Sequence, residues 1–376
     1  MKKKLMIALM AVLMISSLGA CGSKKDTPAE PTDKTAKEEV TDYWSLSVEE
    51  LEVMGYDGDV QAQYVLGVNY DYGINDVEQN FAKAYDWYQM AAQQNDGDAW
   101  CALGYMYMNG CGVEQSNEDA IDCFNQAIDN GCDKANVGIG RMYMGGYGDE
   151  EDRNTQAFSY IQKAYNAGTI DGMYYYGYVN EYGIGVEANY ELAMDSYKKT
   201  IEMTPADVSD QYAINAANTR IGFMYVDAKG VEKDDATAMD YFKAAADADY
   251  AMAQYYMGIL YENGYGTDVD YDEAMDWYQA AAEQDYAPAL NQIGYLYYNG
   301  YGVDVDFEQA VYYQKLSATQ GYAAAQVNLG YLYENGIGVE QNYATALAYY
   351  QLAADQNYEG AKEAVSRVQK LMDEQA

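Results

Sequence analysis

The chain has 376 residues, of which 60 are acidic and 22 are basic, so its formal net charge is −38. A surface this acidic repels nucleic acid and anionic lipid headgroups, which excludes both as expected partners. The sequence contains no histidine, and this excludes Ser-His-Asp and Cys-His catalysis as well as imidazole metal sites.

The first twenty residues have the pattern of a secretory signal peptide. Lys2, Lys3 and Lys4 precede an apolar run that is too short to span a membrane. The run ends in Leu-Gly-Ala before Cys21, which resembles the lipobox of bacterial lipoproteins. This resemblance implies cleavage before Cys21 and diacylation of its thiol, and acyl chains anchor a protein by burying methylene groups. We therefore expect an extracytoplasmic protein that is lipid-anchored to the bacterial cell membrane or outer membrane. The alternative is an ordinary signal peptide followed by a chance cysteine.

Residues 21–42 are rich in Lys, Asp, Glu, Thr and Pro and contain almost no apolar residue, so we expect a disordered tether. Ser47 and Glu50 then form a capping-box pattern. It predicts a short helix within residues 43–59 that covers the first unit of the following segment.

A glycine recurs at a nearly fixed spacing along most of the remaining chain. The spacings are 37, 36, 37, 45, 36, 36 and 36 residues, between Gly67, Gly104, Gly140, Gly177, Gly222, Gly258, Gly294 and Gly330. A period in this range is typical of a repeat array. We therefore expect one all-α solenoid of eight units over residues 60–357, in which each unit packs on its neighbours.

Each unit reads as two helices joined by a turn. A small residue stands five before the glycine, and a tyrosine stands three after it in seven units. These residues share one helical stripe, and the glycine beside that stripe lets a neighbouring helix approach closely. Glycines six and eight after it are expected to end the helix with positive φ, although Asn75 and Ala228 replace one of them in two units.

The second helix of each unit has a recognisable start and a recognisable packing face. A capping residue precedes it in seven units, namely Asn80, Ser116, Asn189, Asp234, Asp270, Asp306 and Asn342. An alanine then marks its packing face, and in most units an aromatic residue follows three positions later: Trp87, Tyr160, Tyr241, Trp277, Tyr313 or Tyr349.

This pattern resembles the Sel1-like repeat, which is related to the tetratricopeptide repeat. The match is A-x-x-x-L-G-x-x-Y-x-x-G-x-G-V followed by D, A-x-x-W/Y and A-A, as in residues 289–318. The resemblance implies a right-handed superhelix of α/α hairpins that serves as a protein-interaction scaffold. The 45-residue spacing contains an insertion near residues 205–210, which we expect in the loop between helix pairs. Residues 358–376 are expected to form a helix that covers the open end through Ala361, Val365, Val368 and Leu371.

Four cysteines follow Cys21, and all lie in the second and third units. Disulfides are common in exported proteins. Cys101 and Cys123 are expected at similar depth on facing helices, so a bridge between them is compatible with the predicted geometry, whereas one between Cys111 and Cys132 is not. Free thiols remain the alternative.

No motif in the sequence indicates catalysis, a metal or a cofactor. The acidic runs around Asp270 and Asp306 lack the EF-hand spacing and are explained as helix caps. Ser196 starts an S-x-x-K pattern that lacks the companion motifs of penicillin-recognising enzymes. We therefore expect a non-enzymatic protein.

A stripe of tyrosines and carboxylates is the candidate binding surface. Its positions lie three before, one after and four after the repeat glycine: Tyr64, Tyr174, Tyr178, Tyr255, Tyr295, Tyr298, Tyr331, Glu262 and Glu334, together with Glu181. It suits a protein or peptide partner, including a cationic segment. Packing inside the solenoid is the alternative explanation for this stripe, and carbohydrate or peptidoglycan binding is the alternative function.

Overall fold

The computed structural model describes residues 42–375, and this part of the chain is helical, with no strand. The predicted signal peptide, the lipidation site Cys21 and all of the tether before Asp42 lie outside the described residues. None of the helices described is long and apolar enough to cross a membrane.

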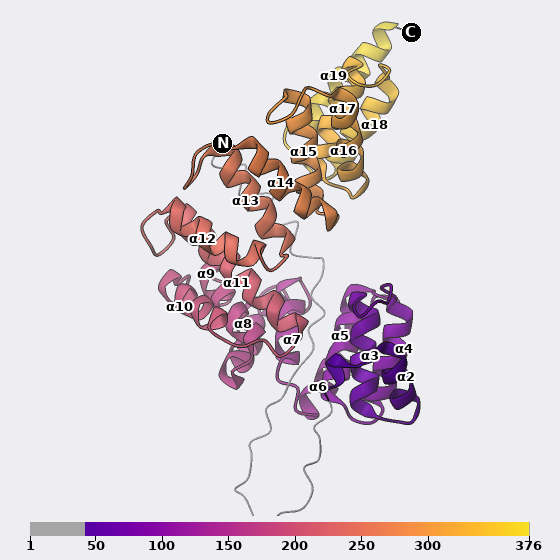
Figure 1. The fold of residues 1–376 in the computed structure, drawn as a ribbon, viewed down its shortest axis with the longest axis vertical. Helices are drawn as coiled ribbons and strands as arrows, with labels where there is room; N and C mark the ends of the chain where they lie inside the picture. Colours follow the sequence, from indigo (N-terminus) through magenta and orange to yellow (C-terminus); the bar gives the residue numbers. More distant parts are fainter. Residues whose placement is uncertain (1–41, 376) are drawn as a thin grey trace, which may run out of the picture. The chain divides into compact units, whose positions relative to one another are not determined.

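A short 3-10 helix, η2 (Tyr43–Ser45), precedes eighteen α-helices in the described chain (Figure 1). Their bounds are α2 Val48–Tyr56, α3 Val60–Tyr72, α4 Phe81–Ala92, α5 Gly97–Asn109, α6 Asn117–Asp129, α7 Ala135–Met144, α8 Arg153–Ala167, α9 Ile170–Tyr182, α10 Tyr190–Ile201, α11 Val208–Asp227, α12 Asp235–Ala246, α13 Ala251–Asn263, α14 Tyr271–Glu283, α15 Ala287–Asn299, α16 Phe307–Thr319, α17 Ala323–Asn335, α18 Tyr343–Asp355 and α19 Ala361–Gln375.

The chain divides into two compact units, one ending at Ala217 and the other beginning at Asn218. In the N-terminal unit, the pairs α3/α4, α5/α6, α7/α8 and α9/α10 each pack together, and every pair also contacts the next. The C-terminal unit repeats this arrangement with α13/α14, α15/α16 and α17/α18. Each unit is therefore an array of helix pairs, which is the α/α solenoid expected from the sequence.

Caps and glycines fix where the helices begin and end. All seven predicted capping residues, from Asn80 to Asn342, accept a hydrogen bond from a backbone N–H of the first helical turn. The turn glycines have positive φ, and Asn75 and Ala228 adopt φ of 56° in their place. The predicted turn geometry is thus confirmed, including at the two positions that depart from glycine.

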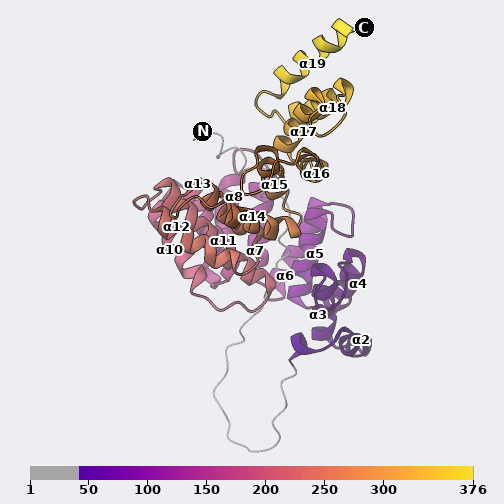
Figure 2. The same ribbon diagram turned by 45° about the horizontal axis from the view of Figure 1, so that its top comes forward.

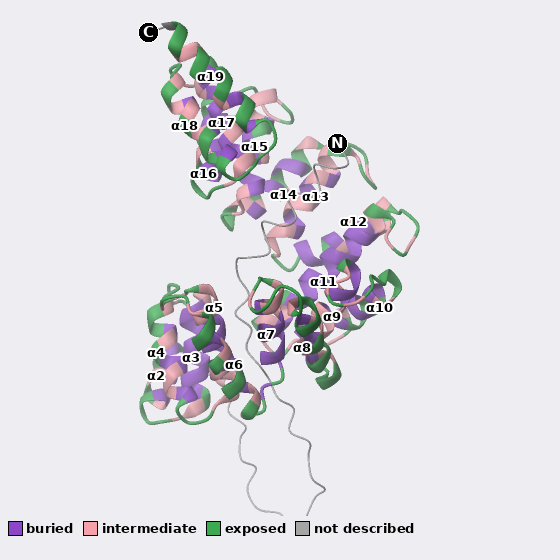
Figure 3. Cartoon of the chain, turned by 180° about the vertical axis from the view of Figure 1, so that it is seen from behind, coloured by how far each residue is buried: buried purple, intermediate pink, exposed green. Residues whose placement is uncertain are grey.

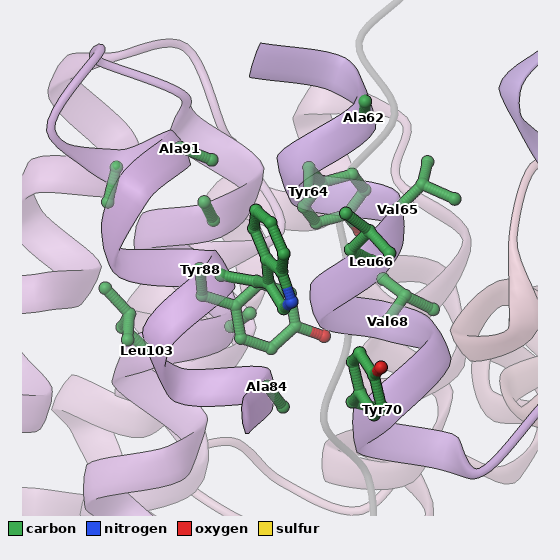
Figure 4. Packing of buried hydrophobic residues seen from close by; sticks show 14 of the residues in the cluster. Ala62, Tyr64, Val65, Leu66, Val68, Tyr70, Ala84, Tyr88, Ala91 and Leu103 are labelled. Carbon is green, nitrogen blue, oxygen red and sulfur yellow. The ribbon is translucent and has the colours of Figure 1, made fainter. Parts of the chain in front are cut away.

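The repeat glycine accommodates a side chain from the second helix of its own pair. A Cβ on Gly67 would lie 2.4 Å from the Tyr88 ring, and one on Gly258 would lie 2.4 Å from the Tyr278 ring. Figure 4 shows the Tyr88 ring extending from α4 toward α3, near Tyr64 and Leu66. In six repeats the close approach predicted at the glycine is therefore an approach of a ring to a helix backbone, while Ile161 faces Gly140 and Gln314 faces Gly294.

A single helix covers each end of the described chain, α2 with 9 residues and α19 with 15. The capping box between Ser47 and Glu50 forms as predicted and starts α2, which packs on α3. At the other end, α19 packs on α18 (Figure 2) and buries Ala364 and Val368 against Tyr350. Figure 3 shows buried segments within helices such as α3, while the turns are exposed.

The insertion between the fourth and fifth repeats is not only a loop, and the sequence-based prediction is wrong on this point. Helix α11 has 20 residues, whereas α9 and α13 each have 13. Asp207 accepts a hydrogen bond from the backbone N–H of Asp210, whose carboxylate accepts one from the N–H of Ala206. These reciprocal bonds resemble a capping box, so part of the insertion extends the first helix of the fifth repeat.

Candidate functional site

The tyrosines three positions before the repeat glycine belong to the packing of their own repeat. Tyr64 is 3% exposed, and its ring centroid lies 6.0 Å from that of Tyr88. Tyr174 is likewise buried and lies 5.8 Å from Tyr197. The ring centroid of Tyr255 also lies 5.8 Å from that of Tyr278. These three residues pack against the second-helix ring, as the packing alternative expects, and their role in partner binding stays a prediction.

The carboxylates four positions after the glycine also have internal roles. The hydroxyls of the second-helix tyrosines donate to them, in the pairs Tyr88–Asp71 (3.2 Å), Tyr197–Glu181 (2.9 Å), Tyr278–Glu262 (2.5 Å) and Tyr350–Glu334 (2.7 Å). Three repeats with Phe124, Ile161 or Phe242 at the ring position instead carry Met108, Met144 or Val226. A buried hydroxyl requires an acceptor, and a side chain without a hydroxyl does not.

Glu262 and Glu334 have further partners. The side-chain amide of Gln292 donates to Glu262 at 3.0 Å, and the guanidinium of Arg367 makes two hydrogen bonds to Glu334. The hydrogen bond from Arg367 is the main cause that lowers the pKa of Glu334. Both glutamates therefore act as acceptors within the repeat array, and their role in partner binding stays a prediction.

An exposed aromatic surface remains on the C-terminal unit. Tyr295 on α15 is 40% exposed and Tyr331 on α17 is 45% exposed, while Tyr298 on α15 is half-buried. A hydrogen bond to Tyr331 is the main cause that raises the pKa of Tyr298, so the two rings are adjacent. In the N-terminal unit, the predicted residue Tyr178 is half-buried against Tyr175 and Tyr182.

Three aromatic residues that sequence reasoning missed extend this surface. Tyr301 lies between the two turn glycines, stacks on Tyr271 with centroids 4.9 Å apart, and contacts Tyr295 at 6.0 Å. Phe307 lies 5.5 Å from Tyr298. The signal was an aromatic residue in the turn or at the start of the second helix. We define the tyrosine face as Tyr271, Tyr295, Tyr298, Tyr301, Phe307 and Tyr331.

The electrostatic environment of the tyrosine face is acidic. Residues 251–335, from the start of α13 to the end of α17, contain 12 acidic residues and one basic residue, Lys315, which gives 1 − 12 = −11. Burial raises the pKa of Tyr295 above its ordinary value, so its hydroxyl stays protonated at neutral pH. The face combines aromatic rings and hydroxyl groups in a negative field, which favours a cationic partner.

The disulfide that the sequence allowed between Cys101 and Cys123 is not formed, because Cys123 is a free thiol. Cys101 packs in the cluster of Tyr105 and Phe124, whereas Cys123 packs in the cluster that contains Leu103. The two side chains thus point to opposite sides of the α5/α6 pair, although their helices are paired as predicted.

Within residues 42–375, no group of three or more acidic or cysteine side chains is arranged to hold a metal ion. Ser196 donates a hydrogen bond to the carbonyl of Leu192 in its own helix and is fully buried. The serine of the S-x-x-K pattern is therefore part of the core of its repeat, while Lys199 is exposed and pairs with Asp195.

The helix pairs, the side chains that pack on the repeat glycines and the positive-φ turns together define an α/α repeat protein. A family model described as the Sel1 repeat matches residues 60–96, 98–132, 134–169, 170–203, 215–250, 251–286, 287–322 and 323–358. The chain belongs to the Sel1 repeat family. Repeats of this family form a non-catalytic scaffold and generally bind protein partners.

Solved structures with similar folds include other Sel1 repeat proteins. A Sel1 repeat protein from Oxalobacter formigenes is 23% identical, covers 90% of this chain and 98% of its own, and superposes with a TM-score of 0.55. A protective antigen of uropathogenic Escherichia coli with an SLR fold is 27% identical, covers 86% of this chain and 67% of its own, and has a TM-score of 0.49. No functionally curated protein matches the chain.

Proposed function

We propose that this Sel1 repeat protein is a non-catalytic scaffold of the bacterial cell envelope, anchored to a membrane through lipid on Cys21. In this proposal, the tyrosine face of the C-terminal unit binds a basic segment of a partner protein. The observation that carries the binding proposal is the group of exposed and half-buried aromatic rings of the tyrosine face within a segment of net charge −11.

The chemistry of the face supports a polypeptide ligand. Aromatic side chains provide a large contact area at low conformational-entropy cost, and their faces attract cations. An acidic surface accelerates association with a basic partner in a salt-dependent manner. Stacking of tyrosines on sugar rings is the basis of the alternative proposal, in which the face binds cell-wall polysaccharide.

The anchoring proposal is tested by the Cys21→Ser variant. We expect it to move from the membrane fraction to the soluble fraction, because it lacks the acylated thiol. Fractionation followed by immunoblotting measures the distribution, and incorporation of a labelled fatty acid into the unaltered chain is the companion measurement. A Cys21→Ser protein that stays membrane-bound would contradict lipid anchoring.

The binding proposal is tested with the full chain carrying Cys21→Ser. Calorimetric titration compares lysine- and arginine-rich peptides with glutamate-rich peptides of the same length, and with soluble peptidoglycan fragments. We expect affinity for the basic peptides, weakened by salt, and at least a tenfold loss in Tyr295→Ser/Tyr331→Ser, since aromatic anchors commonly contribute more than 1 kcal/mol each.

Tyr312→Ser provides a matched control, because Tyr312 on α16 is 53% exposed but lies outside the tyrosine face. It should leave the affinity unchanged. Binding to the cell-wall fragments alone would favour the polysaccharide alternative. An equal loss of affinity in Tyr312→Ser and in Tyr295→Ser/Tyr331→Ser would show that the tyrosine face is not the binding site.

A further inference from the structure

A ring of the second helix normally covers the tyrosine that stands three positions after the repeat glycine. In four repeats the two rings are stacked, with centroids 5.8–6.0 Å apart and interplanar angles of 9–17°. The pairs are Tyr143–Tyr160, Tyr225–Tyr241, Tyr297–Tyr313 and Tyr333–Tyr349. In these four repeats, a stacked aromatic ring of the second helix therefore fills the space beside the first helix.

The second repeat lacks this ring. Its tyrosine at the same position is Tyr107, and the residue that aligns with the stacking rings is Cys123. A cavity of about 380 Å³ occupies the region between α4, α5 and α6, and Tyr107 and Cys123 both line it. This volume lies within the range of small-ligand sites, roughly 300–1,000 Å³. The cavity thus forms where a small side chain replaces a ring.

Aromatic side chains held by hydrogen bonds form the walls of the cavity. The hydroxyls of Tyr85 and Tyr107 lie 2.7 Å apart, and their rings meet edge to face. The side-chain amide of Gln89 donates to the Tyr85 hydroxyl at 2.6 Å. Trp100 completes the walls, while Leu103 and Cys123 contribute buried apolar lining. Rings fixed in this way are preorganised for stacking.

Trp100 is itself a departure from the repeat pattern. Three other repeats have Gln63, Gln254 or Gln326 at this position, and each donates a hydrogen bond to a backbone carbonyl of the preceding helix. The second repeat replaces this structural amide with an indole that lines the cavity. Two substitutions at separate positions, Cys123 and Trp100, therefore contribute to the same site.

Two carboxylates lie among the residues that line the cavity. Asp119 and Asp122 are exposed, lie three residues apart on α6 and have no basic partner in the described chain. The lining contains no lysine or arginine. Burial, followed by the charges of Asp119 and Asp122, raises the pKa of the Cys123 thiol to about 12. The cavity therefore presents a neutral, aromatic interior beside a negative group.

We propose that this cavity binds the guanidinium group of an arginine side chain from a partner polypeptide. A guanidinium is planar, so it can stack on Tyr107 in the space that a ring fills in other repeats. It is cationic and carries several N–H donors for Asp119 and Asp122. An ammonium group has the same charge but lacks the planar surface. The site is in the N-terminal unit and does not depend on the tyrosine face.

Binding of a blocked tripeptide with a single central arginine to the full Cys21→Ser chain tests the proposal. Calorimetry or ligand-detected NMR measures its affinity beside tripeptides in which citrulline or lysine replaces the arginine. We expect binding at least tenfold weaker for citrulline, which is planar but uncharged, and several-fold weaker for lysine. Bound arginine peptide should also slow the reaction of Cys123 with a small thiol reagent, measured in a Cys111→Ser background.

Cys123→Tyr is the decisive variant, because it restores the ring that other repeats carry. It should fold with an unchanged or higher Tm and lose the arginine affinity. Asp119→Asn/Asp122→Asn should weaken binding at least tenfold without altering the circular dichroism spectrum. Equal affinity for arginine and citrulline, or unaltered arginine binding by Cys123→Tyr, would overturn the proposal. Variants Tyr295→Ser/Tyr331→Ser should bind the tripeptide normally, which separates this site from the tyrosine face.

Discussion

At the residue scale, one contact explains three features of the repeat. In six repeats a ring of the second helix packs on the bare backbone of the repeat glycine. Where a tyrosine stands three positions before that glycine, it covers the ring. Where the ring carries a hydroxyl, a carboxylate of the first helix accepts its hydrogen bond. The ring identity therefore determines which residues the first helix can carry.

Gly258→Ala is predicted to destabilise the C-terminal unit, because its Cβ would lie 2.4 Å from the Tyr278 ring. Overpacking of this kind costs about 1–3 kcal/mol, although alanine by itself favours a helix interior by up to about 1 kcal/mol. Urea unfolding measures the loss. Tyr278→Leu removes the ring, so Gly258→Ala should cost little in that background. Additive effects of the two substitutions would contradict the contact.

The sequence predicted much of this contact, but not all of it. The glycine spacing identified the close approach, whereas the ring that fills it follows the packing alanine by four positions, one after the aromatic that the repeat pattern emphasises. Glu262 and Glu334 looked available because they alternate with tyrosines along a stripe. Each of them accepts a hydrogen bond from a tyrosine that lies sixteen residues later, on the second helix of the pair. A pattern read along the first helix alone does not reveal this partner.

At the element scale, the insertion gives the N-terminal unit a buried ionic cluster. Lys134, which is 4% exposed, lies 2.9 Å from Asp207 and 2.7 Å from Asp210. Burial alone lowers the pKa of Lys134, but the charges of Asp207, Asp171 and Asp210 more than offset it, so the pKa is raised. The start of α11 is thus tied to the start of α7.

This cluster illustrates what local sequence patterns miss. Asp207 and Asp210 formed a helix-start pattern within the insertion that could have placed α11 correctly. The pairing of Lys134 with Asp207 spans 73 residues, and no periodic rule relates an insertion to a repeat position. Regular repeats were therefore predictable down to their caps, while the irregular segment was predictable in its location only.

At the scale of the whole molecule, the described chain divides into two units within α11, and each unit is by itself an array of packed helix pairs. Stability in such arrays is a sum of repeat and interface contributions, so the two units can respond separately to solution conditions. Their buried acids differ. In the N-terminal unit, the acids with a raised pKa include the buried Asp71 and Asp171 and the half-buried Asp98, whereas the buried Glu334 of the C-terminal unit has a lowered pKa.

Burial raises the pKa of Asp71 to about 7, that of Asp98 to about 8 and that of Asp171 to about 6. A raised folded-state pKa gives stability that is present at low pH and is lost as the pH rises through it, by up to about 1.4 kcal/mol per pH unit for one group. The pKa of Glu334 is lowered, so its contribution is lost only as the pH falls below the ordinary range of a glutamate.

Raising the pH from 5 to 8.5 is therefore predicted to lower the urea midpoint of the N-terminal unit and to leave that of the C-terminal unit nearly constant. Pulse-labelling hydrogen exchange with mass spectrometry, after equilibration in urea, follows peptides of both units in the unaltered chain. Asp71→Asn removes a group that is 2% exposed and has one buried oxygen without a hydrogen-bond partner. It should flatten the pH dependence of the N-terminal unit alone. Parallel shifts of both units, or an unchanged slope in Asp71→Asn, would show that general charge repulsion rather than these buried acids controls the response.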